Sequence, residues 1–335
     1  MSTATAGTVL ALGLRAGDEV IVRTEAEILA TLDERGELDS LPFMPEMLRF
    51  CGQRMTVRQV ALKACDTVAK SGLRRMRDAV HLVESQCSGA DHGGCENGCS
   101  LYWKEAWLRR PDDAGAPVVA NAARADVATL HANTRRLPGP DGEERFVCQA
   151  TELLRAAPER VTFRDLGQYV RDVRAGNTGP MQSLRAFLVA LYNRLQAVSG
   201  RVIPARFRPG GGRPWGLPLG RAVGRTPTLE LDLRPGERVR IRSRRDIEQT
   251  LNAELKNRGL GFDAEMGRLC GREARVLRRV ERVIDEKTGL MQQMKTPCVV
   301  LEGVVCEGAY NASCPRAWVC FWREIWLERV DEDGD

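Results

Sequence analysis

The sequence predicts an α+β protein made of two duplicated small β-barrel domains that are joined by a helical insert. Three observations lead to this prediction. The chain matches itself when it is shifted by 219 residues. Both matching segments contain short stretches in which apolar and charged residues alternate, which is the pattern of a half-buried strand. Between them lie stretches whose apolar residues recur at the spacing of an amphipathic helix.

Composition limits the classes to which the protein can belong. The chain has 335 residues, of which 43% are hydrophobic and 28% charged, so it can bury a core, and disordered or collagen-like classes are excluded. It has no run of about 18 apolar residues, so no transmembrane helix is expected. The N-terminus lacks the basic start and full apolar core of a signal peptide, which favours a cytoplasmic protein. A net charge of +5 is too small to require a polyanionic partner.

The internal repeat comprises residues 15–110 and 234–331. Cysteines, tryptophans and several other residues recur at the same offset. The matching pairs include Cys51 with Cys270, Cys87 with Cys306, Cys95 with Cys314, Trp103 with Trp322, Trp107 with Trp326, Glu46 with Glu265 and Phe43 with Phe262. Three of the five cysteines in the first copy match, which is improbable by chance. A period this long indicates a duplicated domain rather than a solenoid.

Each repeat is expected to contain one short helix and four strands. In the first repeat these are a strand at 19–23, a helix at 25–33 with Thr24 as its N-cap, and strands at 53–62, 79–84 and 102–108. In the second they are a strand at 238–242, a helix at 245–255 with Ser243 as its N-cap, and strands at 273–283, 298–305 and 321–327. Four or five short strands in about 95 residues predict a small barrel or a rolled sheet. The opening strands, after Gly17 and Gly236, are similar to the first strand of SH3-like barrels, including the KOW and Tudor types.

The rest of the chain is expected to form an N-terminal segment (1–14), a linker (111–142), a helical insert (143–200) and an arm rich in arginine, glycine and proline (201–233). The insert contains three predicted helices, with a capping box at Thr162 and Asp165 and a break between the last two helices at Gly176 and Pro180. We interpret these helices as a packed bundle or a brace between the repeats. A membrane anchor is disfavoured because their polar faces carry few basic residues.

Several longer segments carry a more specific resemblance. They are LPFMPEM at 41–47 with CG at 51–52, VHL at 80–82, HGGC at 92–95, WKEAWL at 103–108, VCQATELL at 147–154, QYVRDVRAGN at 168–177, RGLGFDAEM at 258–266, IDEKTG at 284–289, LEGVVC at 301–306 and WREIWLERV at 322–330. With this layout of repeat, helices and repeat, the chain resembles an uncharacterised bacterial protein family. No activity is attached to that family, so the resemblance implies an architecture and no reaction.

Eleven cysteines is a high number for a chain with no export signal, and an odd count cannot pair completely into disulfides. In a reducing compartment such residues are more often metal ligands, buried apolar groups or reactive thiols. Zinc is the predicted cofactor, with four tetrahedral Cys or His ligands in each repeat. The candidate ligands are Cys87, Cys95 and Cys99 with His81, Cys65 or His92 in the first repeat, and Cys270, Cys298, Cys306 and Cys314 in the second. Buried free thiols, or disulfides in an oxidising compartment, are the alternatives.

An enzyme is the alternative to a binding protein. A catalytic zinc would need an open coordination position and a nearby carboxylate. The candidate carboxylates are Glu84, Asp91 and Glu105. Cys65 could instead act as a nucleophile, because Lys63 would lower its pKa and His81 or His92 could serve as its base. The second repeat has no histidine, so an active site would lie in the first repeat and the second would be degenerate.

Trp103, Glu105 and Trp107 alternate along the last predicted strand of the first repeat, and so share one face. Such a face could form an aromatic cage for a cationic side chain. We favour the interpretation that it is a buried core face, because a closing strand normally buries its large residues.

Positive charge is concentrated between Arg201 and Arg245, a segment with twelve arginines. Arginine-rich arms bind phosphate backbones, which makes nucleic acid a candidate partner. The candidate residues are Arg206, Arg208, Arg213, Arg221 and Arg225. The alternative is an ordinary linker whose arginines pair with acidic surface. We therefore expect a metal-stabilised tandem β-domain protein that binds a partner protein or nucleic acid, with a metal- or cysteine-dependent enzyme as the alternative.

Overall fold

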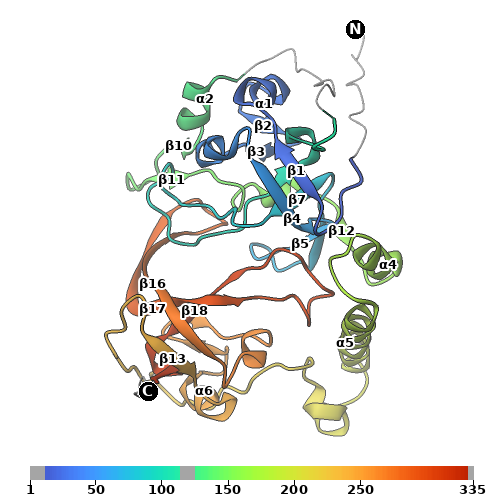
Figure 1. Ribbon diagram of the computed structural model, residues 1–335. Coiled ribbons are helices and arrows are strands. Elements are labelled where there is room, and N and C mark those ends of the chain that lie inside the picture. The colour runs from blue at the N-terminus through green and yellow to red at the C-terminus, as the bar shows by residue number, and fades with distance from the viewer. Residues whose placement is uncertain (1–11, 114–124, 331–335) are drawn as a thin grey trace, which may run out of the picture. The chain divides into compact units, whose positions relative to one another are not determined.

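The computed structural model describes residues 12–113 and 125–330 of the chain (Figure 1). The chain divides into two compact units, residues 1–179 with 284–292 and residues 180–283 with 293–335. The described residues contain a few helices and several small antiparallel sheets, which confirms the α+β class. Most of the predicted N-terminal segment, and part of the predicted linker (114–124), lie outside the described residues.

The first unit is built around a five-stranded antiparallel sheet with the strand order β8-β7-β4-β1-β9. Its strands are β1 (Glu19–Val22), β4 (Arg54–Val60), β7 (Ala79–Leu82), β8 (Trp103–Lys104) and β9 (Leu108–Arg109). Between β1 and β4 lie α1 (Glu25–Thr31), the hairpin of β2 (Glu37–Leu38) and β3 (Leu41–Pro42), and the 3-10 helix η1 (Pro45–Phe50). Thr24 caps α1 as predicted, because its hydroxyl accepts the N–H of Glu27 while the Glu27 carboxylate accepts the N–H of Thr24.

The second unit contains a five-stranded sheet with the strand order β18-β17-β16-β13-β19, which is the order of the first sheet. Its strands are β13 (Arg238–Ile241), β16 (Glu273–Ile284), β17 (Met291–Val305), β18 (Val319–Arg323) and β19 (Leu327–Arg329). The elements between β13 and β16 are α6 (Arg244–Thr250), which Ser243 caps, the hairpin of β14 (Lys256–Asn257) and β15 (Leu260–Gly261), and η5 (Met266–Arg268). Strands β16 and β17 are longer than their counterparts, and the connection at 284–292 belongs to the first unit.

Each five-stranded sheet is strongly rolled. Strands β8 and β9 form opposite edges of the first sheet, yet only η2 (Glu105–Trp107) separates them in the chain. A flat sheet of five strands would hold its edges about 19 Å apart, whereas the chain from Lys104 to Leu108 reaches at most about 14 Å. The edges must therefore curl toward each other. No hydrogen-bonded pairing joins β8 to β9 among the described residues, so the predicted closed, SH3-like barrels are not confirmed.

The predicted last strand of each repeat is interrupted by a 3-10 turn, η2 in the first unit and η6 (Glu324–Trp326) in the second. Trp103 and Trp107 are nevertheless 0% exposed. Both pack edge-on against Phe43, with ring centroids 6.1 and 5.1 Å apart. The second unit repeats this arrangement around Phe262. The tryptophans are therefore core residues, and the aromatic-cage alternative is wrong.

The segment between the two large sheets departs most from the prediction. Its elements are α2 (Val127–Ala132), β10 (Arg135–Arg136), β11 (Arg145–Phe146), α3 (Leu153–Ala156), β12 (Arg160–Val161), α4 (Gly167–Arg174), α5 (Pro180–Ser199), η3 (Ala205–Phe207) and η4 (Pro209–Gly212). Strand β12 extends a small sheet with β5 (Lys63–Cys65) and β6 (Leu73–Arg75). The predicted linker thus carries a helix and a strand. The predicted helical insert is divided, because α4 belongs to the first unit and α5 to the second.

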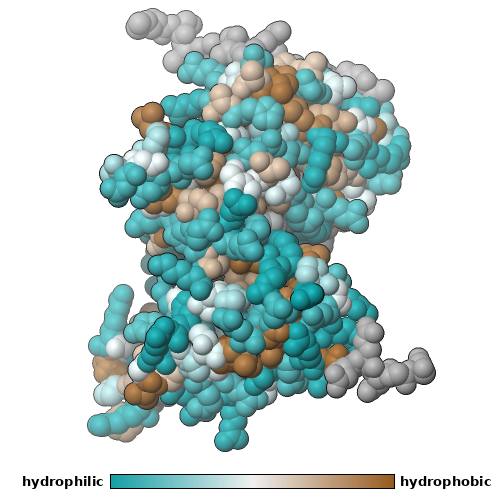
Figure 2. All heavy atoms as spheres, turned by 90° about the vertical axis from the view of Figure 1, so that its left-hand side faces the viewer, coloured by the Kyte–Doolittle hydropathy of each residue, from teal (hydrophilic) through white to brown (hydrophobic). Residues whose placement is uncertain are grey.

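Each unit has its own apolar core, and the two cores share no residue. The face drawn in Figure 2 carries mainly hydrophilic side chains, with apolar ones scattered among them. No helix within the described residues is long and apolar enough to cross a membrane.

Candidate metal centre

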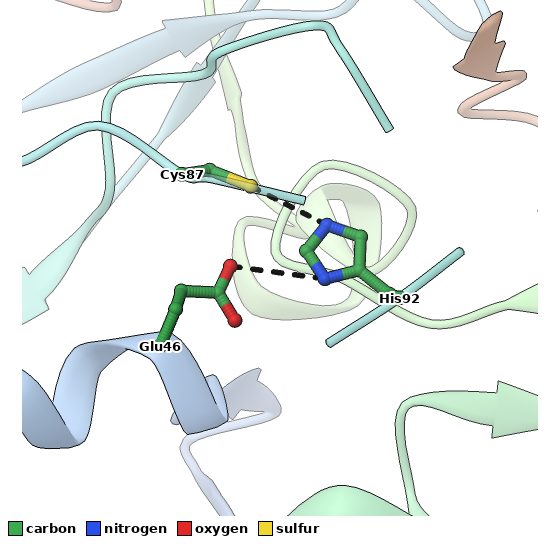
Figure 3. Close-up of side chains that lie close together, drawn as sticks. All are labelled: Glu46, Cys87 and His92. Atoms are coloured by element: carbon green, nitrogen blue, oxygen red, sulfur yellow. Dashed lines mark hydrogen bonds and ion pairs between the residues drawn. The ribbon is translucent and has the colours of Figure 1, made fainter. Parts of the chain in front are cut away.

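Glu46, Cys87 and His92 form a compact cluster in the first unit (Figure 3). Glu46 lies on η1, and the other two residues lie in the glycine-rich loop after β7. The Cys87 Sγ lies 3.3 Å from His92 Nε2, and Glu46 Oε1 lies 3.7 Å from His92 Nδ1. The imidazole therefore stands between a thiol and a carboxylate, which face different ring nitrogens. Within residues 12–113 and 125–330, this is the only group of three or more Cys, His, Asp or Glu side chains close enough to share a metal ion.

A tight turn in the loop returns His92 toward Cys87. The carbonyl oxygen of Gly89 accepts the N–H groups of His92 and Gly94, at 3.2 and 2.8 Å. Gly89 has a φ of +72°, and a Cβ at this position would lie 1.9 Å from the carbonyl oxygen of Cys95. Only glycine tolerates both the left-handed backbone and this close approach. The glycine therefore makes the turn that places the imidazole beside the thiol.

The cluster is buried, and no lysine or arginine among the described residues pairs with its carboxylate. The side chains of Glu46 and His92 are 2% and 1% exposed. Neither carboxylate oxygen of Glu46, nor Nδ1 of His92, makes a hydrogen bond with any described residue. Burial raises the pKa of Cys87 well above its usual value and lowers the pKa of His92. A buried carboxylate without a partner is strongly destabilising, and a bound cation would remove that cost.

The second unit has the same turn but a different cluster. The equivalent residues are Glu265, Cys306 and Asn311. The N–H of Asn311 donates to the carbonyl oxygen of Gly308 at 2.9 Å, as His92 does to its own glycine. The Glu265 carboxylate accepts the N–H of Tyr310, and it lies 3.3 Å from the Arg268 guanidinium. The second unit therefore has no imidazole at this position, and its carboxylate is satisfied by the protein.

Cys95 and Cys99, two other zinc ligands predicted for the first repeat, lie in the same loop without joining the cluster. The Cys95 Sγ accepts the N–H of Ile284 at 3.3 Å, and the Cys99 Sγ accepts a side-chain amide at 3.1 Å. The thiols of Cys99 and Cys148 are close enough to Cys87 to contribute to its raised pKa. Cys99 and Cys148 therefore lie near the cluster without belonging to it.

The candidate catalytic residues lie on three different elements. His81 is fully buried on β7, where its Nδ1 lies 3.0 Å from the carbonyl oxygen of Leu101 and its ring packs against Tyr102. Cys65 ends β5, and Glu105 begins η2. In the part of the chain that the structure describes, none of these three belongs to a group of metal-ligating side chains. A catalytic role for Cys65, His81 and Glu105 therefore stays a prediction.

The four cysteines predicted to hold zinc in the second repeat do not come together in such a group among the described residues. They are Cys270, Cys298, Cys306 and Cys314. Cys298 is 1% exposed on β17 and packs with Val280 and Val300. Burial raises the pKa of Cys270 to about 11. All eleven cysteines are free thiols, so the disulfide alternative gains no support. Of these four, Cys298 and Cys314 are buried, as the buried-thiol alternative predicts, whereas Cys270 and Cys306 are partly exposed.

Sequence reasoning named Cys87 directly and His92 as one of three options, but it missed Glu46. A signal was available, since Glu46 recurs as Glu265 at the repeat offset. The candidate carboxylates Glu84, Asp91 and Glu105 all lie near the cysteines of the loop in sequence. The 3-10 helix η1 instead brings a carboxylate from a much earlier part of the chain.

The arm at 201–233 is partly held by its own unit. Of the five arginines predicted to bind nucleic acid, Arg208 donates to the carbonyl oxygen of Gln196 at 2.9 Å. Arg221 lies 3.6 Å from Glu248. The contact of Arg221 is the kind that the linker alternative predicts, and nucleic-acid binding stays a prediction.

No protein-family model matches the chain, and no curated protein or solved structure shows significant similarity to it. The resemblance to an uncharacterised two-repeat family therefore stays a prediction.

Proposed function

We propose that the first unit binds one divalent transition-metal ion between the Cys87 thiolate and Nε2 of His92, with the Glu46 carboxylate beside it. One observation carries the proposal. The buried Glu46 carboxylate has no hydrogen-bond partner among the described residues, yet it lies beside a thiol and an imidazole. Thiolate and imidazole ligands favour zinc over magnesium or calcium. Zinc is therefore the metal that suits this set best.

The distances support an ion between Cys87 and His92. A tetrahedral zinc with bonds of about 2.3 Å to sulfur and about 2.1 Å to nitrogen holds those two atoms about 3.6 Å apart. The two atoms are 3.3 Å apart, so a small outward shift admits the ion. Metal binding would hold Cys87 as a thiolate against the effect of burial on its pKa. Cys99 and Cys148, whose thiols influence the pKa of Cys87, are candidates for further ligands.

Glu46 has a supporting role in this proposal. A histidine that binds metal through one ring nitrogen usually donates its other N–H to a carboxylate, which fixes the tautomer and strengthens the ligand. Glu46 faces Nδ1, which is the nitrogen opposite the thiol. We therefore expect Glu46 to tune the affinity of the site and to balance its charge.

The burial of the cluster favours a structural metal. Structural zinc sites are closed by protein ligands, whereas catalytic sites keep a position open to substrate. Because Glu46 and His92 are almost fully buried, a substrate has no direct access to them. The function that follows is that of a metal-stabilised protein, which binds a partner protein or nucleic acid through surfaces outside the site.

A duplication accounts for the likeness of the two units, and a common SH3-like ancestor is part of this proposal. It is supported by the shared strand order, by the capped helix after the first strand, and by the 3-10 turn before the last strand. In this proposal the second unit is a copy that keeps the scaffold and lacks the metal site.

One observation favours a second function. The order thiol, imidazole, carboxylate is that of a cysteine nucleophile with its base and the group that orients the base. Burial opposes this function, because the raised pKa keeps Cys87 protonated at neutral pH. The metal site therefore remains the better-supported proposal.

The test is the metal content of the purified full-length chain, measured by elemental analysis. We expect about one zinc per chain. Cys87→Ser and His92→Ala should abolish the bound zinc, whereas Glu46→Gln should weaken zinc affinity by roughly 10- to 100-fold. Cys306→Ser and Asn311→Ala change the equivalent positions of the second unit and are the matched controls, so they should retain one zinc. A wild-type protein without metal, or controls that lose it, would contradict the proposal.

Thiol reactivity separates the second function from the first. If Cys87 were a nucleophile activated by His92, iodoacetamide would alkylate Cys87 of the metal-free protein rapidly at neutral pH. His92→Ala would then slow that reaction. For a metal site we expect the opposite effect of the variant. His92→Ala should speed alkylation of Cys87 in the protein as purified, because the ion that protects the thiol is lost, and chelation should have the same effect on wild type. Peptide mapping after a timed reaction distinguishes the two results.

A further inference from the structure

The first unit contains a cavity of about 390 Å³ that the metal cluster does not use. Its wall comes from the loop before β2, from the segment between β3 and η1, from α2 and from α3. Gly36 has a φ of +70°, and a Cβ there would lie 2.6 Å from Leu130 of α2, so this glycine allows the helix to approach the loop. Phe43 and Leu130 contribute apolar surface to the wall. The size is that of a site for a small organic molecule.

The wall of the cavity is positively charged. Four arginines and two glutamates line it, which leaves a net charge of +2. The arginines are Arg35, Arg135, Arg136 and Arg155, and the glutamates are Glu37 and Glu152. No other charged side chain contributes to the lining.

Both glutamates are already neutralised by arginines. Arg155 binds Glu37 through two hydrogen bonds of 3.0 and 2.9 Å and Glu152 through one of 2.7 Å. Arg136 also binds Glu152. The two carboxylates are 7% and 3% exposed, so they hold these guanidinium groups in fixed positions at the wall.

The other two arginines supply the excess charge. The guanidinium of Arg35 makes no ion pair or hydrogen bond with a described residue. Arg135 pairs with Glu144, but both side chains are more than 60% exposed, and such pairs contribute little. The cavity therefore combines an apolar wall with two guanidinium groups: that of Arg35, which has no described partner, and that of Arg135, which an anion could share with Glu144 and the Phe146 ring.

We propose that this cavity binds a small organic anion whose phosphate or carboxylate group is held by Arg35 and Arg135 and whose apolar part lies against Phe43 and Leu130. The planar guanidinium group matches both oxyanions, because it presents two parallel N–H donors. The excess positive charge selects anions over neutral molecules, and the apolar wall selects organic anions over inorganic phosphate.

Calorimetric titration of the purified full-length chain tests this site. The probes are phenyl phosphate, benzoate and inorganic phosphate. We expect one phenyl phosphate or one benzoate to bind per chain, more tightly than inorganic phosphate. The tighter of the two organic probes identifies the preferred oxyanion.

Two single variants make the test specific to the cavity. Arg35→Ala should weaken binding of the organic probe by roughly 10-fold, as expected for the loss of a hydrogen bond to a charged group. Arg54→Ala removes the same charge from β4, where Arg54 pairs with the exposed Glu19, and should leave binding unchanged. Absence of saturable binding with all three probes would overturn the proposal, as would an equal effect of the two variants.

Discussion

The loops after β7 and β17 share a backbone and differ in chemistry. In both, a glycine with positive φ accepts the N–H of the third residue after it, His92 in the first loop and Asn311 in the second. In both, a Cβ on that glycine would collide with the carbonyl oxygen of a cysteine, at 1.9 and 2.4 Å. The turn is therefore a property of the scaffold, and the side chain that it presents is free to differ.

The two units also differ in the cation that lies beside the buried glutamate. In the second unit Arg268 lies 3.3 Å from Glu265 and 2.8 Å from Glu307. In the first unit the equivalent Arg49 donates to the carbonyl oxygen of Gln86 at 3.3 Å. A cation from the protein thus neutralises one carboxylate, and the other has none among the described residues. The unit that has asparagine in place of the histidine thus also has an ion pair at its buried glutamate.

Removal of the metal should affect the two units most unequally, because only the loop of the first unit holds it. Metal binding contributes directly to folding, because ligands held by an ion are not organised without it. We expect chelation to speed amide hydrogen exchange in the loop at 87–99 by roughly 100-fold or more. Exchange in the loop at 306–315 should not change. Equal acceleration in both loops would show that the units do not differ in this way.

The turn glycines provide the next test. Gly89→Ala and Gly308→Ala each force a side chain into a left-handed backbone and against a carbonyl oxygen. Each should lower the free energy of unfolding by roughly 3 kcal/mol. Both effects can be measured by urea denaturation. Gly89→Ala should also release zinc, whereas Gly308→Ala should retain it, and zinc loss from both variants would contradict the comparison.

Much of the fold could be predicted because local signals repeat in both units. The N-caps at Thr24 and Ser243 and the paired tryptophans were found from sequence, and the structure confirms them. The 3-10 turns were not predicted, because the alternation of large and small residues around Glu105 is also the pattern of a strand. The predicted helical insert begins instead with strand β11, because Arg145 and Phe146 pair with β10.

The candidate site was predicted only in part. Cys87 and His92 lie in one short loop, so their proximity follows from the sequence. Glu46 and Cys148 approach the loop from distant segments, and no periodicity within either segment indicates this contact. The cysteine spacing also predicted a metal site in the second repeat. The absence of histidine from that repeat was the better indication, because it argues against such a site.

Substitution of the threonines that bind the buried tryptophans should destabilise the two units equally. Trp107 Nε1 donates to Thr31 Oγ1 at 3.1 Å, and Trp326 Nε1 donates to Thr250 Oγ1 at 2.9 Å. Thr31→Val and Thr250→Val keep the shape and remove the acceptor, which leaves a buried N–H unsatisfied. Each should cost about 2 kcal/mol of unfolding free energy. Tryptophan fluorescence in urea measures both losses of unfolding free energy. Clearly unequal losses would mean that the two cores differ in energy although their geometry is alike.

The smallest expected effect concerns the turn after β5 and its counterpart after β16. Asp66 and Asp285 each accept the N–H of the third residue after them, at 2.7 and 2.8 Å, but only Asp66 also binds an arginine, Arg74. Burial opposes ionisation of Asp66, yet hydrogen bonds from Ser71, Ala69 and Arg74 outweigh it and lower the pKa to about 2. A lowered pKa stabilises the fold above the unfolded value of about 3.9, and this contribution is lost as the pH falls toward 2.

Asp66→Asn should therefore cost about 1 kcal/mol of unfolding free energy above pH 5, after allowance for solvent screening. The difference from wild type should shrink between pH 4 and pH 2, as the wild-type carboxylate becomes protonated. Asp285→Asn is the matched control, and we expect it to cost less because no described arginine binds that carboxylate. Urea denaturation at a series of pH values measures both. A constant Asp66→Asn difference across that range would mean that the charge of Asp66 does not stabilise the first unit.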